Sequence, residues 1–130
     1  MKKTELNNMN TATLAYMGDG VWEQAVRRRL IQAGAVRVDR LQKTAAARYV
    51  SAAAQAGIVL ALYDELDEKE QSRINRWKNY KPRSLPKNGD PKEYRWATAF
   101  EAFLGYLYLA EDGDRLRWVL KRAFEIAEDR

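Results

Sequence analysis

The 130-residue sequence contains no cysteine and no histidine. Without cysteine the chain can form no disulfide bond and has no thiolate nucleophile, which fits a reducing compartment such as the cytoplasm. Without histidine it lacks the commonest general base, the Ser-His and Cys-His nucleophile pairs, and the usual zinc ligand. Any catalysis by this chain must therefore use carboxylates, amines, hydroxyl groups or a hard metal ion.

Long apolar runs and alternating apolar and polar positions are also missing. The first ten residues contain two lysines with no apolar stretch after them, so we expect no signal peptide. The longest apolar stretch is too short and too interrupted to span a bilayer. No segment shows the period of two that is typical of a strand. We expect a soluble, cytoplasmic, all-α protein that has no membrane partner and forms one domain over residues 1–130.

Helical periodicity and stop signals divide the chain. We expect residues 1–10 to be frayed, a first long helix to start at Asn10 or Thr11, and Gly34 to follow its end. An alanine-rich helix should end at Gly57, and Asp67 should start a later helix. All three prolines lie between residues 79 and 91, which predicts a long loop. The expected helices are residues 11–31, 42–56, 58–66 (a short helix or turn), 67–77, 92–110 and an amphipathic one after residue 114.

Two nearly apolar segments each contain one acid. In residues 96–110, WATAFEAFLGYLYLA, the only charge is on Glu101, and in residues 11–22 it is on Asp19, which lies between two glycines. Glycine within a helix costs roughly 0.5–1 kcal/mol relative to alanine, which is tolerable where something must approach the backbone closely. Each acid alone could pair with a buried Arg or Lys. Their matching contexts predict instead that they meet, and Glu23, one turn after Asp19, projects from the same side.

Clustered carboxylates in a chain without cysteine or histidine favour Mg²⁺, with Mn²⁺ as a second choice. Such an ion binds phosphate oxygens and activates water for attack. The charge distribution agrees with a phosphate-rich substrate. Between Arg73 and Arg95 there are eight Lys or Arg and two acidic residues, a local excess of six positive charges in a chain of net charge +5. A cationic run can be no more than a solvated face, but this concentration predicts a polyanionic partner.

The segments around the two acids resemble a known family. LAYMGDGVWE is similar to the signature helix of ribonuclease III domains, and FEAFLGYLYL is similar to their second acidic helix. The likeness is closest to Mini-ribonuclease III, a branch with the catalytic domain alone. It covers nearly the whole chain, including AARYVSAAAQA and the basic RINRWKNYK before the proline-rich loop.

This resemblance implies an all-α endonuclease domain that works as a homodimer on double-stranded RNA. Asp19 falls on the signature aspartate and Glu101 on the metal-binding glutamate, so both are the expected catalytic residues and Mg²⁺ ligands. The chain departs from the wider family at Ala15 and Thr98, where other members have acids, and at Gly20, where alanine is usual. Water, RNA phosphates or Glu23 would complete the metal ligands. The expected products carry 5′-phosphate ends, and the expected substrate is a ribosomal RNA precursor, in 23S maturation.

The basic segment is the expected RNA-binding region, since A-form RNA is recognised largely through phosphates and 2′-hydroxyls. Trp77 is the one tryptophan that we expect to contact RNA. The candidate RNA-binding residues are Arg73, Arg76, Lys78, Lys81, Arg83 and Lys87. Two alternatives remain open: a non-catalytic RNA-binding or ribosome-assembly module with the same fold, and a helical interaction protein whose acids are ion-paired. Metal-dependent cleavage of duplex RNA distinguishes the endonuclease from both.

Overall fold

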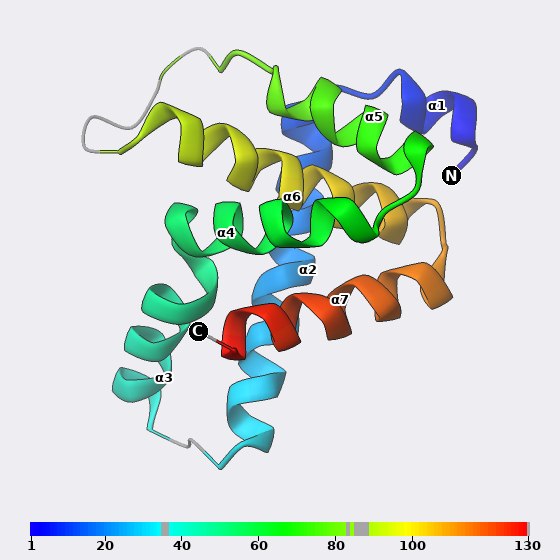
Figure 1. Cartoon of the computed structure of the whole chain (residues 1–130). Helices are drawn as coiled ribbons and strands as arrows, with labels where there is room; N and C mark the ends of the chain where they lie inside the picture. Colours follow the sequence, from blue (N-terminus) through cyan, green and yellow to red (C-terminus); the bar gives the residue numbers. More distant parts are fainter. Residues whose placement is uncertain (35–36, 83, 85–88, 130) are drawn as a thin grey trace.

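Helix α6 (Pro91–Leu109) lies at the centre of the fold. The computed structural model describes residues 1–34, 37–82, 84 and 89–129. Helix α6 packs against α2 (Thr11–Gln32), α4 (Ala52–Leu62) and α5 (Glu68–Lys78). Figure 1 shows α2 passing behind α6, with α4 and α5 in front of it. From 97 to 107 every residue except Glu101 is buried, which confirms the predicted helix with apolar surroundings on nearly all sides.

Shorter helices complete the molecule, and the described residues contain no strand. The prediction of an all-α protein is confirmed, and the fold is a single domain. Among the described residues no single helix is long and apolar enough to cross a membrane; one bent pair, Val38–Val50 with Ala52–Glu65, passes by length and composition alone. The remaining elements are α1 (Lys3–Asn7), α3 (Val38–Ala45), the π-helical turn η1 (Ala46–Val50), the 3-10 turn η2 (Tyr63–Glu65) and α7 (Gly113–Glu128).

Helices α2 and α6 cross with backbone against backbone. A Cβ atom added to Gly18 would lie 1.6 Å from the backbone oxygen of Glu101, and one added to Gly105 would lie 2.0 Å from that of Leu14. Only glycine allows this approach. The hypothesis of a close approach is therefore correct for Gly18. It is wrong for Gly20, where an added Cβ would meet only the terminal carbon of Met17, at 4.0 Å.

The side chain of Trp22 fixes the middle of α2 in the core. Its indole ring is stacked on Phe124 of α7 with a centroid distance of 4.9 Å, and it meets Phe100 of α6 edge-on at 5.1 Å. Its Nε1 donates a hydrogen bond to the backbone oxygen of Tyr49 at 2.8 Å. One fully buried side chain thus joins α2, α6, α7 and the η1 turn, which fixes the segment that carries Asp19.

Side-chain caps set several helix starts where the sequence predicts them. Asn10 accepts a hydrogen bond from the backbone N–H of Ala12 at 2.8 Å, so α2 begins as expected. Asp67 and Glu70 form a reciprocal capping box at 2.8 and 3.0 Å, which confirms the start of α5. Gly34 has φ 100°, the left-handed conformation of a residue that follows a helix end.

The prediction of frayed residues 1–10 is wrong. Residues Lys3–Asn7 form α1, and the side chain of Leu6 is completely buried in the core. The N-terminal ammonium group of Met1 donates a hydrogen bond to the backbone oxygen of Leu109 at 2.8 Å. One leucine in a polar segment is enough to hold it, because burying a leucine side chain contributes about 1.5–3 kcal/mol.

The predicted boundaries in the alanine-rich region are also wrong. Residues 38–41, which lie between two of the expected helices, form the first turn of α3, and Gly57 lies inside α4 instead of ending a helix. The actual break is at Ser51, which has extended backbone torsions and whose Oγ accepts a hydrogen bond from the N–H of Ala54 at 3.1 Å. A serine cap among alanines therefore divides what composition alone suggests is one helix.

Candidate active site

Asp19 and Glu101 meet where α2 crosses α6, as predicted. Asp19 is exposed and Glu101 is half-buried, the only accessible residue in its buried stretch. Burial raises the pKa of Glu101 to about 8, with contributions from hydrogen bonding to Asp19, the negative charge of Asp19 and, last, that of Glu23. At neutral pH the protonated form of Glu101 is therefore favoured. A cation that binds to the two carboxylates would displace this proton.

Gln55 is the third polar side chain at this place, and the sequence did not single it out. It comes from α4 and is 4 % exposed. A hydrogen bond from its side chain lowers the pKa of Glu101, in opposition to the acids. Its Nε2 donates to the backbone oxygen of Val50 at 2.9 Å, whereas its Oε1 has no hydrogen-bond partner among the described residues. The available signal was a lone polar residue in the otherwise apolar segment AAAQAGIVLAL.

Glu23 lies near the pair but is engaged elsewhere. Its carboxylate accepts a hydrogen bond from Arg27 at 3.2 Å, an exposed ion pair one turn along α2. Among the described residues no group of three or more His, Cys, Asp or Glu side chains is placed to hold a metal ion. The structure thus brings Asp19 and Glu101 together, with Glu23 at the edge of the site.

The two positions at which the chain departs from the wider family add no acid. Thr98 is buried on α6 and its Oγ1 donates to the backbone oxygen of Tyr94 at 2.9 Å, so its hydroxyl is satisfied within the helix. Ala15 is buried on α2. The protein oxygens that meet at the site are those of the two carboxylates of Asp19 and Glu101. Two mutually repelling carboxylates suit a hard divalent cation such as Mg²⁺ or Mn²⁺.

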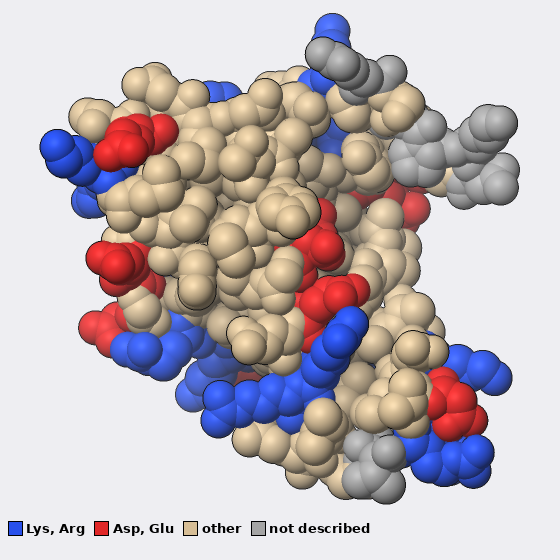
Figure 2. Space-filling model, turned by 180° about the vertical axis from the view of Figure 1, so that it is seen from behind, with Lys and Arg blue, Asp and Glu red and all other residues tan. Residues whose placement is uncertain are grey.

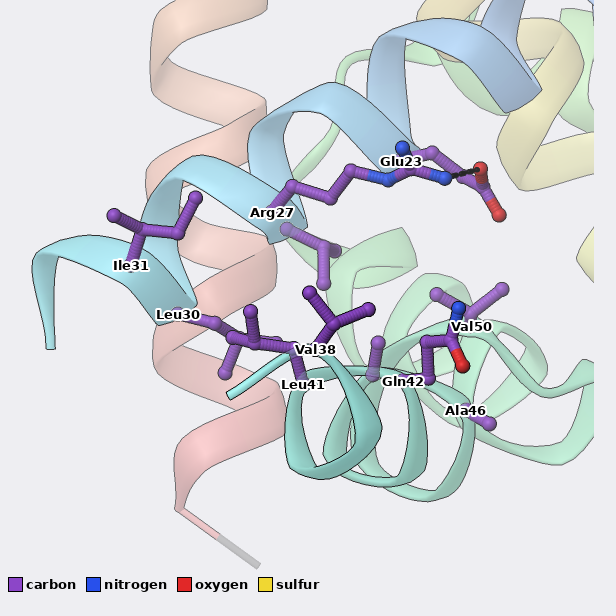
Figure 3. A pocket seen from close by; sticks show the side chains of 11 residues that line it. Glu23, Arg27, Leu30, Ile31, Val38, Leu41, Gln42, Ala46 and Val50 are labelled. Carbon is purple, nitrogen blue, oxygen red and sulfur yellow. Dashed lines mark hydrogen bonds and ion pairs between the residues drawn. The ribbon is translucent and has the colours of Figure 1, made fainter. Parts of the chain in front are cut away.

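An apolar groove of about 440 Å³ lies beside Glu23, between α2 and the α3–η1 segment. Figure 3 shows Glu23 and Arg27 joined at its upper edge and Leu30, Val38 and Leu41 farther down. Apolar walls cannot stabilise a phosphate or a metal ion. The chemistry therefore belongs to the acid pair and not to this groove.

The candidate RNA-binding residues on α5 rest on aromatic rings. The Arg73 guanidinium lies 4.6 Å from the ring centre of Tyr106, that of Arg76 lies 5.9 Å from Trp77, and the Lys78 ammonium lies 4.9 Å from Trp96. Lys81, just beyond α5, is exposed. Arg83 and Lys87 lie outside the described residues. None of these contacts involves Asp19 or Glu101, so the role of these residues in RNA binding stays a prediction.

The prediction that Trp77 contacts RNA is wrong. Trp77 is 1 % exposed and packs against Phe103 and Tyr106 between α5 and α6. Trp96 is half-buried and lies beneath Lys78. The basic residues around Trp77 suggested an exposed side chain. On an amphipathic helix, however, basic side chains can face the solvent while the indole faces the core.

On the face seen from behind, acidic side chains gather in a hollow near the middle (Figure 2). Lys and Arg side chains border the hollow on its lower side, and a broad area without charged side chains lies next to it. A negative hollow with cations at its border can hold a metal ion and a phosphate group side by side.

The comparisons with known proteins agree with this geometry. Residues 12–112 match the family described as Ribonuclease III domain, and this match covers most of the chain. The chain therefore belongs to the ribonuclease III family. Its sequence is 47 % identical to Mini-ribonuclease 3 of Symbiobacterium thermophilum, over 89 % of this chain and 88 % of that one. It is 44 % identical to Mini-ribonuclease 3 of Brevibacillus brevis, over 98 % of both chains.

A solved structure extends the likeness to three dimensions. The crystal structure of protein FN1578 from Fusobacterium nucleatum superposes with a TM-score of 0.80 at 28 % identity, covering 93 % of this chain and 96 % of that one. The predicted resemblance to Mini-ribonuclease III is confirmed, and with it the prediction of a ribonuclease III-type endoribonuclease.

Proposed function

We propose that this protein is a divalent-metal-dependent endoribonuclease that cleaves double-stranded RNA, with Asp19 and Glu101 holding the metal ion. The endoribonuclease class follows from membership of the ribonuclease III family and from relatives named Mini-ribonuclease 3. The observation that carries the metal dependence is the meeting of two carboxylates at the α2–α6 crossing, where their proximity contributes to the raised pKa of Glu101. A cation at this point relieves the repulsion that the metal-free protein relieves with a proton.

Glu101 and Asp19 have different roles in the proposed metal site. Glu101 is held in the buried stretch of α6 and must lose its proton before it can bind a cation. Asp19 is exposed, so it faces an incoming substrate. A bound Mg²⁺ or Mn²⁺ would supply Lewis-acid activation of the scissile phosphate and of the attacking water, giving products with 5′-phosphate ends.

Glu23 is the proposed third carboxylate of the site. Its ion pair with Arg27 is exposed on both sides, at 40 % and 75 % of the side-chain areas. Exposed pairs of this kind contribute about 0–1 kcal/mol. Glu23 can therefore leave Arg27 and bind a metal ion at little cost in free energy. The Arg27 guanidinium would then be available to an RNA phosphate.

RNA is the substrate class that the family supports, and we propose a duplex region of precursor ribosomal RNA, in 23S maturation, as the natural target. Arg76, Lys78 and Lys81 would contact its backbone, because their positive charges project from one end of α5 and the adjoining segment. Arg83 and Lys87 extend this proposal along the sequence. Arg73 is a weaker candidate since it lies in the middle of α5, away from this end, and over the ring of Tyr106. The cytoplasm, where such RNA is processed, is the proposed location.

A symmetric homodimer is the proposed assembly. Tyr16, 84 % exposed, and Ile31 leave apolar surface uncovered on α2, the helix that carries Asp19. The area without charged side chains in Figure 2 adjoins the acidic hollow. Pairing two such faces about a two-fold axis would bury this surface and give one acid pair for each RNA strand.

The experiment that tests the proposed function is cleavage of a labelled RNA duplex, with Mg²⁺ or with EDTA. Wild-type protein is expected to cut only with the metal, and Asp19→Asn and Glu101→Gln are expected to lose cutting while remaining folded. Glu5→Gln, on α1, is a matched control for the loss of an exposed acid. Near wild-type cleavage by either amide variant would overturn the site assignment.

A second candidate function is favoured by one observation, the absence of a three-acid group among the described residues. A site with two firmly placed carboxylates could have lost turnover while the fold still binds RNA. Duplex RNA that is bound but never cut, at any divalent metal concentration, would establish this non-catalytic RNA-binding module.

A further inference from the structure

One ion pair on α2 joins the acids of the candidate site to an exposed cation. Asp19, Glu23 and Arg27 follow one another at intervals of four residues, so their side chains lie along one side of the helix. The Nη2 of Arg27 donates to the Oε2 of Glu23 at 3.2 Å (Figure 3). The negative charge of Glu23 also contributes to the raised pKa of Glu101. Glu23 therefore contacts a cation on one side and acts on the acid pair on the other.

This ion pair is looser than other arginine pairs of the protein. Arg115 binds the carboxylate of Glu70 through two nitrogens, at 2.7 and 2.8 Å. Arg29 binds Glu128 through two nitrogens as well. Arg27 uses a single nitrogen, and its side chain is 75 % exposed. A guanidinium has five N–H donors, so most of those on Arg27 bond to no described residue and are free for a second anion.

The ion pair opposes the binding of both proposed ligands. While Arg27 is bound to Glu23, its positive charge lies next to the oxygens that a metal ion would use, and like charges repel. The same pair holds the guanidinium back from a phosphate, which it could otherwise bind through two parallel hydrogen bonds. Breaking the pair once serves both ligands. The second ligand to bind therefore does not meet the cost that the first has already met.

We propose that RNA and the divalent cation bind cooperatively to this protein, because Arg27 exchanges Glu23 for an RNA phosphate while Glu23 exchanges Arg27 for the cation. This inference rests on the proposed function, and it makes Arg27 a positioning residue that acts on the metal through Glu23. Each ligand then raises the affinity for the other by the same factor. Because exposed ion pairs are weak, this factor is limited to about two- to fivefold.

The first test measures Mn²⁺ binding in the absence of RNA, by titration calorimetry. Arg27→Gln leaves Glu23 without its cation and is expected to bind Mn²⁺ about two- to fivefold more tightly than the wild type. In a Glu23→Gln background this gain should disappear. Arg28→Gln is the matched control, because Arg28 is an exposed neighbour with no ion pair to a described residue. A gain equal to that of Arg28→Gln, or one that persists without Glu23, would overturn the inference.

The second test measures binding of a labelled RNA duplex in EDTA, where no metal-dependent cutting occurs. Glu23→Gln frees Arg27 and is expected to tighten RNA binding about two- to fivefold, and this gain should disappear in the Arg27→Gln background. Asp114→Asn is the matched control, since it frees Arg117 from an exposed ion pair on α7. An equal gain in Asp114→Asn would show a general effect of charge and would overturn the exchange.

The remaining outcomes separate the inference from the function on which it rests. Wild-type protein that binds no Mn²⁺, or no duplex RNA, would contradict the proposed function itself. Binding of both ligands with purely additive effects of Glu23→Gln and Arg27→Gln would overturn the exchange alone. Both side chains are accessible to solvent, so the variants are expected to fold. Arg27→Lys keeps a charge that can pair with Glu23, and it is expected to restore the weaker Mn²⁺ binding of the wild type.

Discussion

At the scale of the residue, Glu101 makes the stability of the metal-free protein depend on pH. Its pKa in the folded protein is about 8, against 4.5 for the unfolded chain. The folded state therefore binds the proton more tightly, and the resulting stability is fully present below pH 4.5 and is lost as the pH rises to about 8. The loss is on the order of a few kcal/mol, because each tenfold difference in proton affinity between the folded and unfolded states corresponds to about 1.4 kcal/mol.

We expect Glu101→Gln to remove this dependence, because an amide cannot ionise. In denaturant unfolding with EDTA, the variant should gain stability relative to the wild type as the pH is raised from about 4.5 to about 8, the range over which the unfolded chain has lost this proton and the folded wild type still holds it. Glu23→Gln is the control, since Glu23 makes the last of the contributions to the pKa of Glu101. Parallel stability curves for Glu101→Gln and the wild type would contradict the placement of Glu101 beside Asp19.

At the scale of the element, the crossing of α2 and α6 depends on one of the two glycines that flank Asp19. A methyl group on Gly18 would overlap the backbone of Glu101 at 1.6 Å, whereas one on Gly20 would meet only the terminal carbon of Met17, at 4.0 Å. Gly18→Ala must force the helices apart, so we expect the variant to unfold or to lose most of its stability. Gly20→Ala should gain about 0.5–1 kcal/mol, the helix advantage of alanine.

The two alanine variants are each other's control, because they make the same change two residues apart on one helix. Thermal and denaturant unfolding measure both. Equal effects of the two substitutions would show that α2 and α6 do not approach each other as described, and the meeting of Asp19 with Glu101 would then lack its structural basis.

Elements with strong local signals could be predicted from the sequence. The Asp67–Glu70 capping box and the Asn10 cap act within four residues, so pattern and structure agree there. The breaks that were missed depend on contacts distant in sequence. Leu6 orders the N-terminal segment only because its side chain is buried in the core. Ser51 caps a helix inside a segment whose composition favours one continuous helix.

The same distinction applies to the candidate site. Asp19 and Glu101 could be identified because an acid in an apolar helix is conspicuous and matches a family pattern. Gln55 could not, since its place beside Glu101 arises from the packing of α4 on α6. The inward orientation of Trp77 likewise depends on where α5 lies, which its basic sequence does not reveal.

At the scale of the whole molecule, the proposed dimer predicts a particle of twice 15.0 kDa. Light scattering coupled to gel filtration measures this mass directly. Tyr16→Lys places a charge on the exposed apolar surface of α2, and we expect it to shift the equilibrium toward the monomer. Leu60→Lys, on α4, is the control for an added charge at an exposed apolar residue and should leave the dimer intact. A wild-type monomer at micromolar concentration would contradict the proposed assembly.

The cations at the C-terminal end of α5 and just beyond it, Arg76, Lys78 and Lys81, should make RNA binding sensitive to salt. Phosphate contacts release counterions, and each contact adds about 0.7–0.9 to the slope of log affinity against log salt concentration. Replacing Arg76, Lys78 and Lys81 by alanine should therefore weaken binding and lower this slope by about two to three. Cleavage at saturating RNA should suffer less, because contacts remote from the acids hold the substrate and the transition state alike.

The measurement is binding of duplex RNA to an Asp19→Asn background over a salt series, which separates binding from cutting. The control removes Lys69, Arg117 and Lys121, three exposed cations from the start of α5 and from α7, so that the loss of net charge is the same. If general attraction to a basic protein were the whole effect, the two triple variants would weaken binding equally. A specific contact surface predicts that only the Arg76, Lys78 and Lys81 variant lowers the slope, and an unchanged slope in that variant would place the RNA on another face of the molecule.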